Sequence, residues 1–447
     1  MTAVATRPVA ARPARGAVPT LVVANAGTLL VLLAFTMPIS SLPTTAAGLH
    51  SGPAGRTREL SGIGLGLAAL LLVAGGLADD YGRRRVFALG AVVFAAASAA
   101  AAAAPDTGVF IAARIAEGAG AAALLSTALG LVGHAVPAGP ARARATATWG
   151  AMVGAGITIG PLLAGLLTQL VSWRAGYGVV AVAGAVLAVA ARLALAESRA
   201  AVPRRPDAVG ALTLGAGLSC LLAALVEGRT GWARWPVAAL FAVAAAALVA
   251  FMVSQVAGRE PLLDLGLFRR PEFAVATGGA LFTGLSVIAL MNVLPAAWER
   301  RYGLGPLAAS GVYAIWAATS FLASLAARRI AGSGRAPLAV GFALAAAGQL
   351  AMVDVGSWPW LVPGLLVSGT GTGLLNAALG RLAVASVPAG RAAMGSGANN
   401  TARYLGSSVG IALVVAVTPG QAAMVAAGFA AAGALFTAVL SGLSTRE

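Results

Sequence analysis

Apolar stretches of about 20 residues recur along the whole chain, and short charged segments separate them. Each stretch is long enough to cross the roughly 30 Å hydrocarbon core of a bilayer as an α-helix. Only 10% of the residues are charged, whereas soluble domains have roughly 25%. The sequence therefore predicts an all-α integral membrane protein with about fourteen transmembrane helices.

The arginines indicate how the chain sits in the membrane. The net charge is +16, every basic residue is arginine, and most arginines fall between the apolar stretches. In a soluble chain this charge would suggest nucleic acid, but here the positive-inside rule explains it. With both termini in the cytoplasm, the inner loops hold about three times as many arginines as the outer ones. We predict a multi-pass protein of the cell membrane (inner or plasma membrane) with cytoplasmic termini and no nucleic-acid partner.

The sequence offers no pattern for catalysis or for a bound cofactor. No group of His, Cys, Asp and Glu has metal-ligand spacing, and no glycine-rich loop ends in the Lys-Ser or Lys-Thr of a nucleotide-binding loop. We therefore expect no enzyme, no ATP-driven pump, no metal and no cofactor. Acids near the expected outer helix ends, such as Glu59, are expected to be solvated.

Two polar breaks divide the chain. One runs from Glu197 to Asp207 and the other from Gly258 to Arg270. They predict a plan of six, two and six helices. The expected parts are a cytoplasmic tail (1–17), an N-terminal six-helix bundle (18–196), a linker with two additional helices (197–272), a C-terminal six-helix bundle (273–442) and a second cytoplasmic tail (443–447).

A tight charged turn, GGLADDYGRRR, begins at Gly75 between two apolar stretches. Gly75 and Gly82 permit a sharp reversal and close backbone approach, and Asp79 is expected to close the outgoing helix. The turn resembles the signature loop between helices 2 and 3 of the major facilitator superfamily of secondary transporters. The alternative is an ordinary basic loop that obeys the positive-inside rule. The resemblance implies that Gly75, Asp79, Gly82 and Arg83 form a conformational latch at the inner face, where a carboxylate docks on a helix N-terminus in one state.

The expected fourth span carries RIAEGAGAA from Arg114, which resembles the R-x-x-Q-G-x-G-A-A motif of the same superfamily with Glu117 in place of glutamine. Glu117 is expected roughly 14 Å from the outer end of its helix, near the bilayer midplane. Arg114 and Glu117 share one helix face and can neutralise each other. Two interpretations stay open: a purely structural pair, or a site at which Glu117 binds protons or a substrate cation.

The expected fifth span contains Gly156-x-x-x-Gly160-Pro161-x-x-Ala164-Gly165. Its small residues permit close contact with a partner helix, and Pro161 bends the helix by removing a backbone hydrogen bond. The pattern resembles the antiporter motif of exporter branches of the superfamily. A generic close-packed Gly/Pro helix is the alternative.

Further motifs resemble the fourteen-helix drug:proton antiporter family. They are Asp207-x-x-Gly210, Gly231-Trp232 and the run GSGANNTARYLG from Gly395. The resemblance implies two six-helix bundles related by pseudo-symmetry, a midplane cavity, alternating access, and a monomer in the lipid bilayer that carries a small molecule and protons. The candidate polar residues of the cavity are Thr36, Asn376, Asn400 and Arg403.

One departure from that family concerns the energy source. Ala34 stands where the first helix of the family usually carries an acid. Proton coupling would then depend on Glu117 or on groups that the sequence does not identify. The sequence favours a proton-coupled exporter of small hydrophobic or cationic compounds such as antibiotics, driven by the proton gradient. The alternatives are a uniporter or uptake carrier on the same fold and a non-transporting membrane scaffold or sensor.

Overall fold

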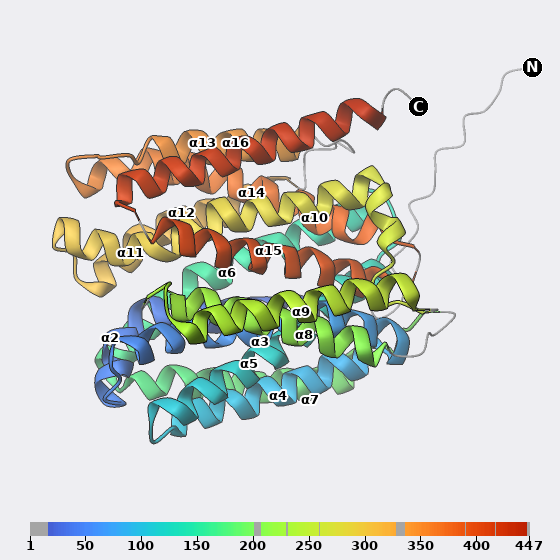
Figure 1. The fold of residues 1–447 in the computed structure, drawn as a ribbon, viewed down its shortest axis with the longest axis horizontal. Helices are drawn as coiled ribbons and strands as arrows, with labels where there is room; N and C mark the ends of the chain where they lie inside the picture. The colour runs from blue at the N-terminus through green and yellow to red at the C-terminus, as the bar shows by residue number, and fades with distance from the viewer. Residues whose placement is uncertain are drawn as a thin grey trace, which may run out of the picture.

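The computed structural model describes residues 17–200, 207–228, 231–258, 260–327, 336–388, 390–415 and 417–444, so residues 1–16 and 445–447 of the two expected tails lie outside the described residues. Throughout these ranges the regular structure is helical (Figure 1). The helices are α1 (Ala17–Thr36), α2 (Pro38–Gly48), α3 (Pro53–Tyr81), α4 (Arg83–Ala103), α5 (Thr107–Ala135), α6 (Pro140–Leu170), α7 (Trp173–Ala194), α8 (Ala208–Gly228), α9 (Trp235–Ala257), α10 (Pro271–Thr283), α11 (Ala289–Tyr302), α12 (Pro306–Ala327), α13 (Ala336–Leu350), α14 (Leu361–Ala385), α15 (Ala392–Val414) and α16 (Pro419–Ser444).

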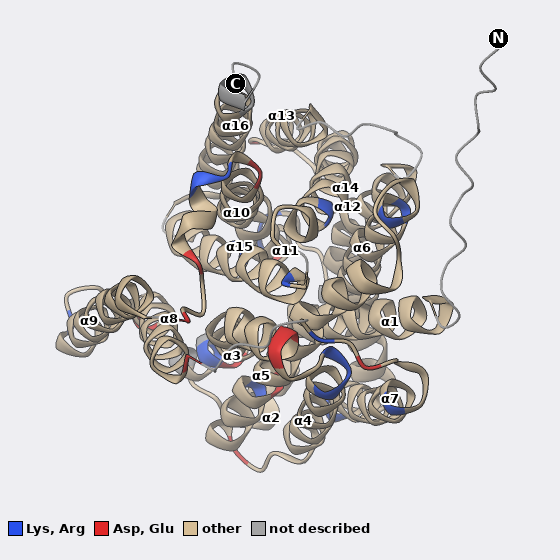
Figure 2. Cartoon of the chain, turned by 90° about the vertical axis from the view of Figure 1, so that its right-hand side faces the viewer, with Lys and Arg blue, Asp and Glu red and all other residues tan. Residues whose placement is uncertain are grey.

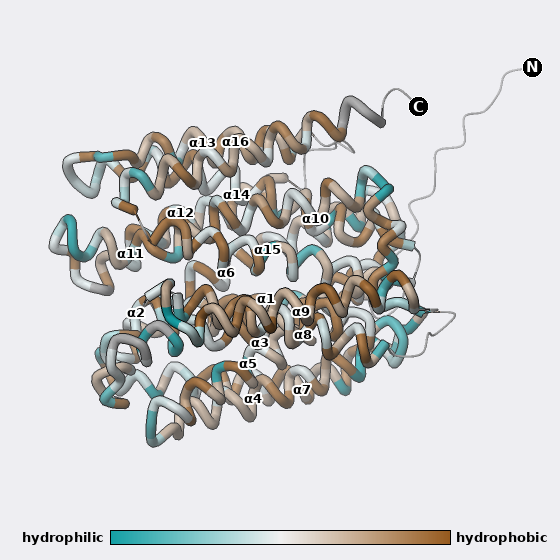
Figure 3. Tube along the Cα trace, viewed as in Figure 1, coloured by the Kyte–Doolittle hydropathy of each residue, from teal (hydrophilic) through white to brown (hydrophobic). Residues whose placement is uncertain are grey.

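Twelve of the described helical segments are long and apolar enough to span a membrane, if α10 and α11 are taken as one. Helix α13 is apolar but shorter, with 15 residues, and α15 carries an arginine and two asparagines near its middle. Hydropathy therefore finds most of the helices, and the expected all-α membrane fold is confirmed. Figure 3 shows the apolar residues along the helix middles and the hydrophilic ones mainly near the ends.

Local sequence explains where the helices start and stop. Several helices begin at proline, whose missing N–H costs nothing in the first turn. The Asp106 carboxylate accepts a hydrogen bond from Val109 N and caps α5, and the Ser172 hydroxyl caps α7 in the same way. A short π-helical turn, η2 (Gly284–Ile288), joins α10 to α11, so these two form one continuous but irregular helix.

The helices pack as two halves. In the first half, α5 packs on α3 and α4, α7 packs on α4, and α6 packs on α1. In the second half, α14 packs on α12 and α13, and both α15 and α16 pack on α10. Helices α3, α5 and α6 of the first half contact α12, α14 and α15 of the second. The α8–α9 pair lies at the side, with α8 against α3 (Figure 2).

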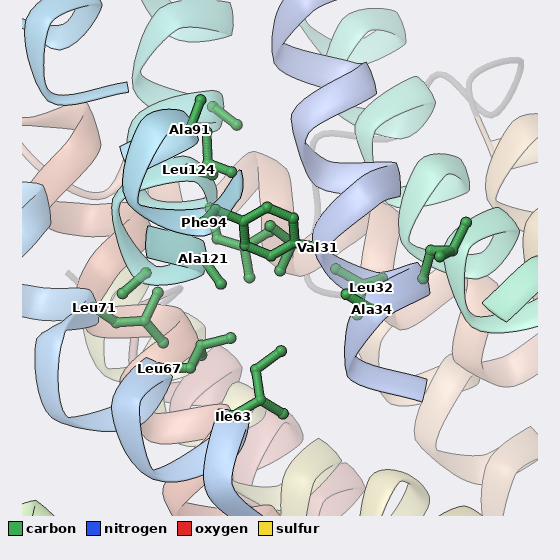
Figure 4. Packing of buried hydrophobic residues seen from close by; sticks show 14 of the residues in the cluster. Val31, Leu32, Ala34, Ile63, Leu67, Leu71, Ala91, Phe94, Ala121 and Leu124 are labelled. Carbon is green, nitrogen blue, oxygen red and sulfur yellow. The ribbon is translucent and has the colours of Figure 1, made fainter. Parts of the chain in front are cut away.

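The core of the first half combines small and bulky side chains. Figure 4 shows Val31 and Leu32 of α1 near Phe94 of α4, with Leu67 of α3 and Leu124 of α5 in the same cluster. All five side chains are buried. Because alanine and glycine fill many of the remaining positions, neighbouring backbones lie close together.

Candidate functional site

Asp79 joins the two halves at the end of the molecule where α3 meets α4. Its carboxylate is fully buried and accepts hydrogen bonds from Met394 N at 2.8 Å and Ala393 N at 3.3 Å, in the first turn of α15. Arg83 donates to the same carboxylate through Nη2 at 2.6 Å and Nε at 2.9 Å. The unpaired N–H groups and the partial positive charge of a helix N-terminus favour a carboxylate there.

Two further contacts cross between the halves beside Asp79. Arg83 Nη2 donates to Gly390 O at 2.7 Å, and Arg391 Nη1 donates to Asp80 Oδ1 at 2.7 Å. We call Asp79, Asp80, Arg83 and Arg391 the inner latch. Figure 2 looks onto this end, where acidic and basic segments meet between α3 and α4.

The glycines of the turn have the expected roles, whereas Asp79 does not end its helix. Gly82 adopts φ +117°, a conformation that favours glycine. A Cβ at Gly75 would overlap the carbonyl oxygen of Ala393, so this glycine lets α3 approach α15. Helix α3 continues to Tyr81, and Asp79 lies inside its last turn, facing α15. The sequence did not identify Asp80 or Arg391 as members of the latch.

Arg114 and Glu117 form an ion pair inside the first half. Both side chains are fully buried, and Arg114 Nη1 lies 2.5 Å from Glu117 Oε2. Ser98 donates to Glu117 Oε1 at 2.8 Å, and Arg114 Nη2 donates to the carbonyl oxygen of Ala34 at 3.1 Å. The pair thus links α5 to α4 and α1. The structure brings Arg114 directly to position 34, where this chain lacks an acid.

Gly156 and Gly160 of α6 face α1. A Cβ at Gly156 would lie 2.6 Å from Leu29 O, and one at Gly160 would lie 2.5 Å from Leu33 O. Pro161 lies inside the helix beside this contact. Gly165 is less confined, since its nearest neighbour would be Leu307 Cδ1 of α12 at 3.3 Å. The motif therefore mainly serves contact between α6 and α1.

This packing predicts that Gly160→Val destabilises the protein by about 1–3 kcal/mol, because the added methyl groups force the α1 backbone away. Gly178→Val on α7 is the matched control, since nothing lies within 4 Å of a Cβ there. The free energy of unfolding in detergent measures both variants. Equal stability of Gly160→Val and the parent would contradict this account of the α6 motif.

A pocket lies between the two halves, lined by residues of both. We call it the central pocket. The candidate cavity residues Thr36, Asn376, Asn400 and Arg403 all line it, whereas Glu117 and Arg114 do not. Much of the remaining wall is aromatic, and sequence reasoning did not single out these residues because aromatic side chains are common in apolar helices. They are Phe35, Trp149, Tyr313, Trp316 and Tyr404.

A second pocket adjoins the central one and shares Phe35, Asn292 and Tyr404 with it. It is lined by α3, α8, α11 and α15, and Arg300 is its one charged lining residue. Neither pocket has an aspartate or a glutamate among its described lining residues. A cationic compound would therefore find no counter-ion in either wall.

Glu59 differs from its expected solvated role. Its side chain is buried, its Oε1 accepts a hydrogen bond from Ser51, and Ser51 is 2.6 Å from the hydroxyl of Thr107. Glu59 therefore ties the start of α3 to the start of α5. A hydropathy pattern does not show this burial, because the covering residues come from distant parts of the chain.

Comparisons with known proteins agree with this architecture. The family model of the Major Facilitator Superfamily matches residues 24–411. A probable actinorhodin transporter of Streptomyces coelicolor is 32% identical over 79% of this chain and 64% of its own length, so the chain spans slightly under two thirds of that relative. The multidrug resistance protein Stp of Mycobacterium tuberculosis is 29% identical over 89% of this chain and 75% of its own length. The puromycin resistance protein pur8 of Streptomyces alboniger is 30% identical over 90% of this chain and 82% of its own length.

Solved structures show the same fold. The human organic anion transporter MFSD10 (TETRAN) aligns with a TM-score of 0.68 at 19% identity, over 96% of this chain and 100% of that one. The proton:xylose symporter XylE aligns with a TM-score of 0.67 at 12% identity, over 95% of this chain and 96% of that one. Family model, relatives and fold together show that the chain belongs to the major facilitator superfamily and is a membrane transporter, not an enzyme.

Proposed function

We propose that the protein is a proton-coupled exporter of small hydrophobic compounds, antibiotics included, and that it works by alternating access. Relatives named for drug and antibiotic resistance or transport support the direction and the cargo class. The single observation that carries the mechanism is a central pocket between two halves that the inner latch joins on one side. We propose that this side faces the cytoplasm, with both termini there, in the inner or plasma membrane, and that the monomer is the working unit.

In this mechanism the inner latch stabilises one of two states. Asp79 binds the first turn of α15 only when the halves are closed at this end. Tilting the halves would break these contacts, open the pocket inward and expose Arg83 to water. A contact that exists in one state biases the equilibrium by its own free energy.

The walls of the two pockets favour hydrophobic cargo. The exposed lining is mostly apolar, aromatic rings supply much of the central wall, and acids are missing from the described lining. Such a wall selects ligands by shape and by a few polar groups. We therefore do not extend the proposal to cationic compounds, which the sequence alone allowed.

We propose Glu117 as the proton-binding group, because Ala34 leaves the first helix without an acid. Glu117 lies in the middle of α5, and its ion pair with Arg114 reaches α1, which lines the central pocket through Leu32 and Thr36. A proton on Glu117 would weaken that pair and thereby alter the contact between α5 and α1. Protonation of Glu117 would thereby affect the pocket wall through α1, without direct contact between Glu117 and cargo.

Everted membrane vesicles test this function. Respiration acidifies them, and a pH-sensitive dye is expected to recover fluorescence when a transported hydrophobic antibiotic is added. Vesicles without the protein give the baseline. Transport without any recovery would favour a uniporter or uptake carrier. Unchanged cellular accumulation of every compound in a broad panel would favour a non-transporting scaffold or sensor.

A further inference from the structure

The central pocket contains a buried cation that has no acidic partner among the residues that the structure describes. The Arg403 side chain lies in the middle of α15, and the residue is 4% exposed. Its Nη1 donates to Asn376 Oδ1 at 2.9 Å, while its Nε and Nη2 have no hydrogen-bond partner in the described part of the chain. The buried acids Asp79 and Glu117 are paired with other arginines. A buried guanidinium without a counter-ion is costly, and arginine stays protonated in proteins.

The free atoms of Arg403 form a specific binding edge. Nε–H and Nη2–H of a guanidinium point the same way and match the two oxygens of a carboxylate. Asn376 holds the opposite side of the group through Nη1. The edge without partners is thus the one that suits a bidentate anion.

Two other donors of the same pocket also lack partners. Trp149 and Trp316 both line it, are 1% and 2% exposed, and leave their indole Nε1 atoms without an acceptor. An unmet buried donor costs about 1–3 kcal/mol. Among the described lining residues, the buried side-chain atoms that lack a hydrogen-bond partner are therefore all donors, which a ligand rich in acceptor oxygens would satisfy.

The backbone around Arg403 is closely packed. A Cβ at Gly284 would overlap the carbonyl oxygen of Arg403, so the π-turn η2 rests directly on α15. This contact holds the backbone of Arg403 against the second half, and Asn376 of α14 holds its side chain. The guanidinium is therefore preorganised rather than free to swing toward water.

We propose that the central pocket binds aromatic compounds that carry an anionic group, a carboxylate or an ionised phenol, with Arg403 as the counter-ion. The aromatic walls hold the ring system, and the Nε and Nη2 edge of Arg403 holds the oxygens. The indole N–H groups of Trp149 and Trp316 accommodate further carbonyl or phenolic oxygens. This inference deepens the proposed export function and rests on it for the role of the pocket.

Three probes with one ring system test the charge preference: anthracene carboxylate, anthracene methanol and anthracene methylamine. Their binding to the full-length protein in lipid nanodiscs is followed by fluorescence anisotropy. The parent is expected to bind the carboxylate about tenfold or more tightly than the methylamine. A tenfold preference corresponds to about 1.4 kcal/mol. Arg403→Gln is expected to remove this preference while changing the affinity for the methanol, which carries no charge, by less than about threefold.

Two further variants keep the test falsifiable. Arg403→Lys retains the charge but loses the bidentate edge, so it is expected to keep part of the preference even where Arg403→Gln folds poorly. Arg192→Gln removes an exposed arginine at the far end of α7 and is expected to bind like the parent. Equal binding of all three probes by the parent, preference for the methylamine, or an unchanged preference in Arg403→Gln would each overturn the inference.

Failure of this inference can be told apart from failure of the proposed function. If everted vesicles export the neutral methanol while the carboxylate has no advantage in binding, the anion site is refuted and export stands. If the carboxylate preference depends on Arg403 but vesicles move no compound, the binding site stands and export is refuted.

Discussion

Asp79→Asn is expected to open the end of the protein that carries the inner latch, which we propose faces the cytoplasm, and to lower export at least tenfold. The substitution removes the charge that holds the first turn of α15 and leaves Arg83, only 2% exposed, without its counter-ion. Breaking a buried ion pair costs about 3–5 kcal/mol. The inward-open state escapes most of that cost because water reaches Arg83. A shift of about 3 kcal/mol changes the ratio of the two states roughly a hundredfold.

Distance measurements between spin labels check this shift. The native Cys220 is first replaced by serine, and labels are placed at Arg144→Cys on α6 and Arg269→Cys before α10, two exposed positions in opposite halves. The distance distribution is expected to move to longer values in Asp79→Asn. Asp264→Asn, which changes an exposed acid, is the control. A parent-like distribution together with parent-like export would refute the latch.

Sequence reasoning located the latch from one side only. The turn from Gly75 to Arg83 is local, so its glycines and charges can be read as a unit. Its partner, Met394, lies 315 residues further along the chain. The local sequence there does not indicate the contact, because it is made by backbone N–H groups at a helix start, which do not depend on the residue type. The same holds for Arg391, which looks like any loop arginine.

The polar residues of the central pocket could be predicted from the sequence, but the surroundings of those residues could not. Asn376 and Arg403 stand out as polar groups inside apolar helices, and such residues are expected to face a cavity. The lack of an acid beside Arg403 in the described chain could not be predicted, because it depends on which faces of α14, α15 and α6 meet. For Glu117 the sequence did not show the surroundings: the side chain is fully buried beside α4 and α1 and does not line the central pocket.

Glu117→Gln is expected to destabilise the protein by about 3–5 kcal/mol, more than Arg114→Met does. Both side chains are fully buried, but the two charges differ in how they can be relieved. A carboxylate left alone in Arg114→Met becomes neutral by taking up a proton. A guanidinium left alone in Glu117→Gln cannot lose its charge. The double variant removes both charges and is expected to recover most of the stability, which unfolding in detergent measures.

The double variant also separates the two roles that the sequence left open for this pair. If Glu117 binds the coupled proton, as we propose, Arg114→Met with Glu117→Gln is expected to restore the fold but not dye recovery in everted vesicles. Downhill exchange of cargo is expected to persist, because the pocket and the inner latch are untouched. A double variant that is both stable and fully proton-coupled would make the pair purely structural. The coupling group would then have to be sought among other acids, and Glu59 is a buried one outside this pair and the inner latch.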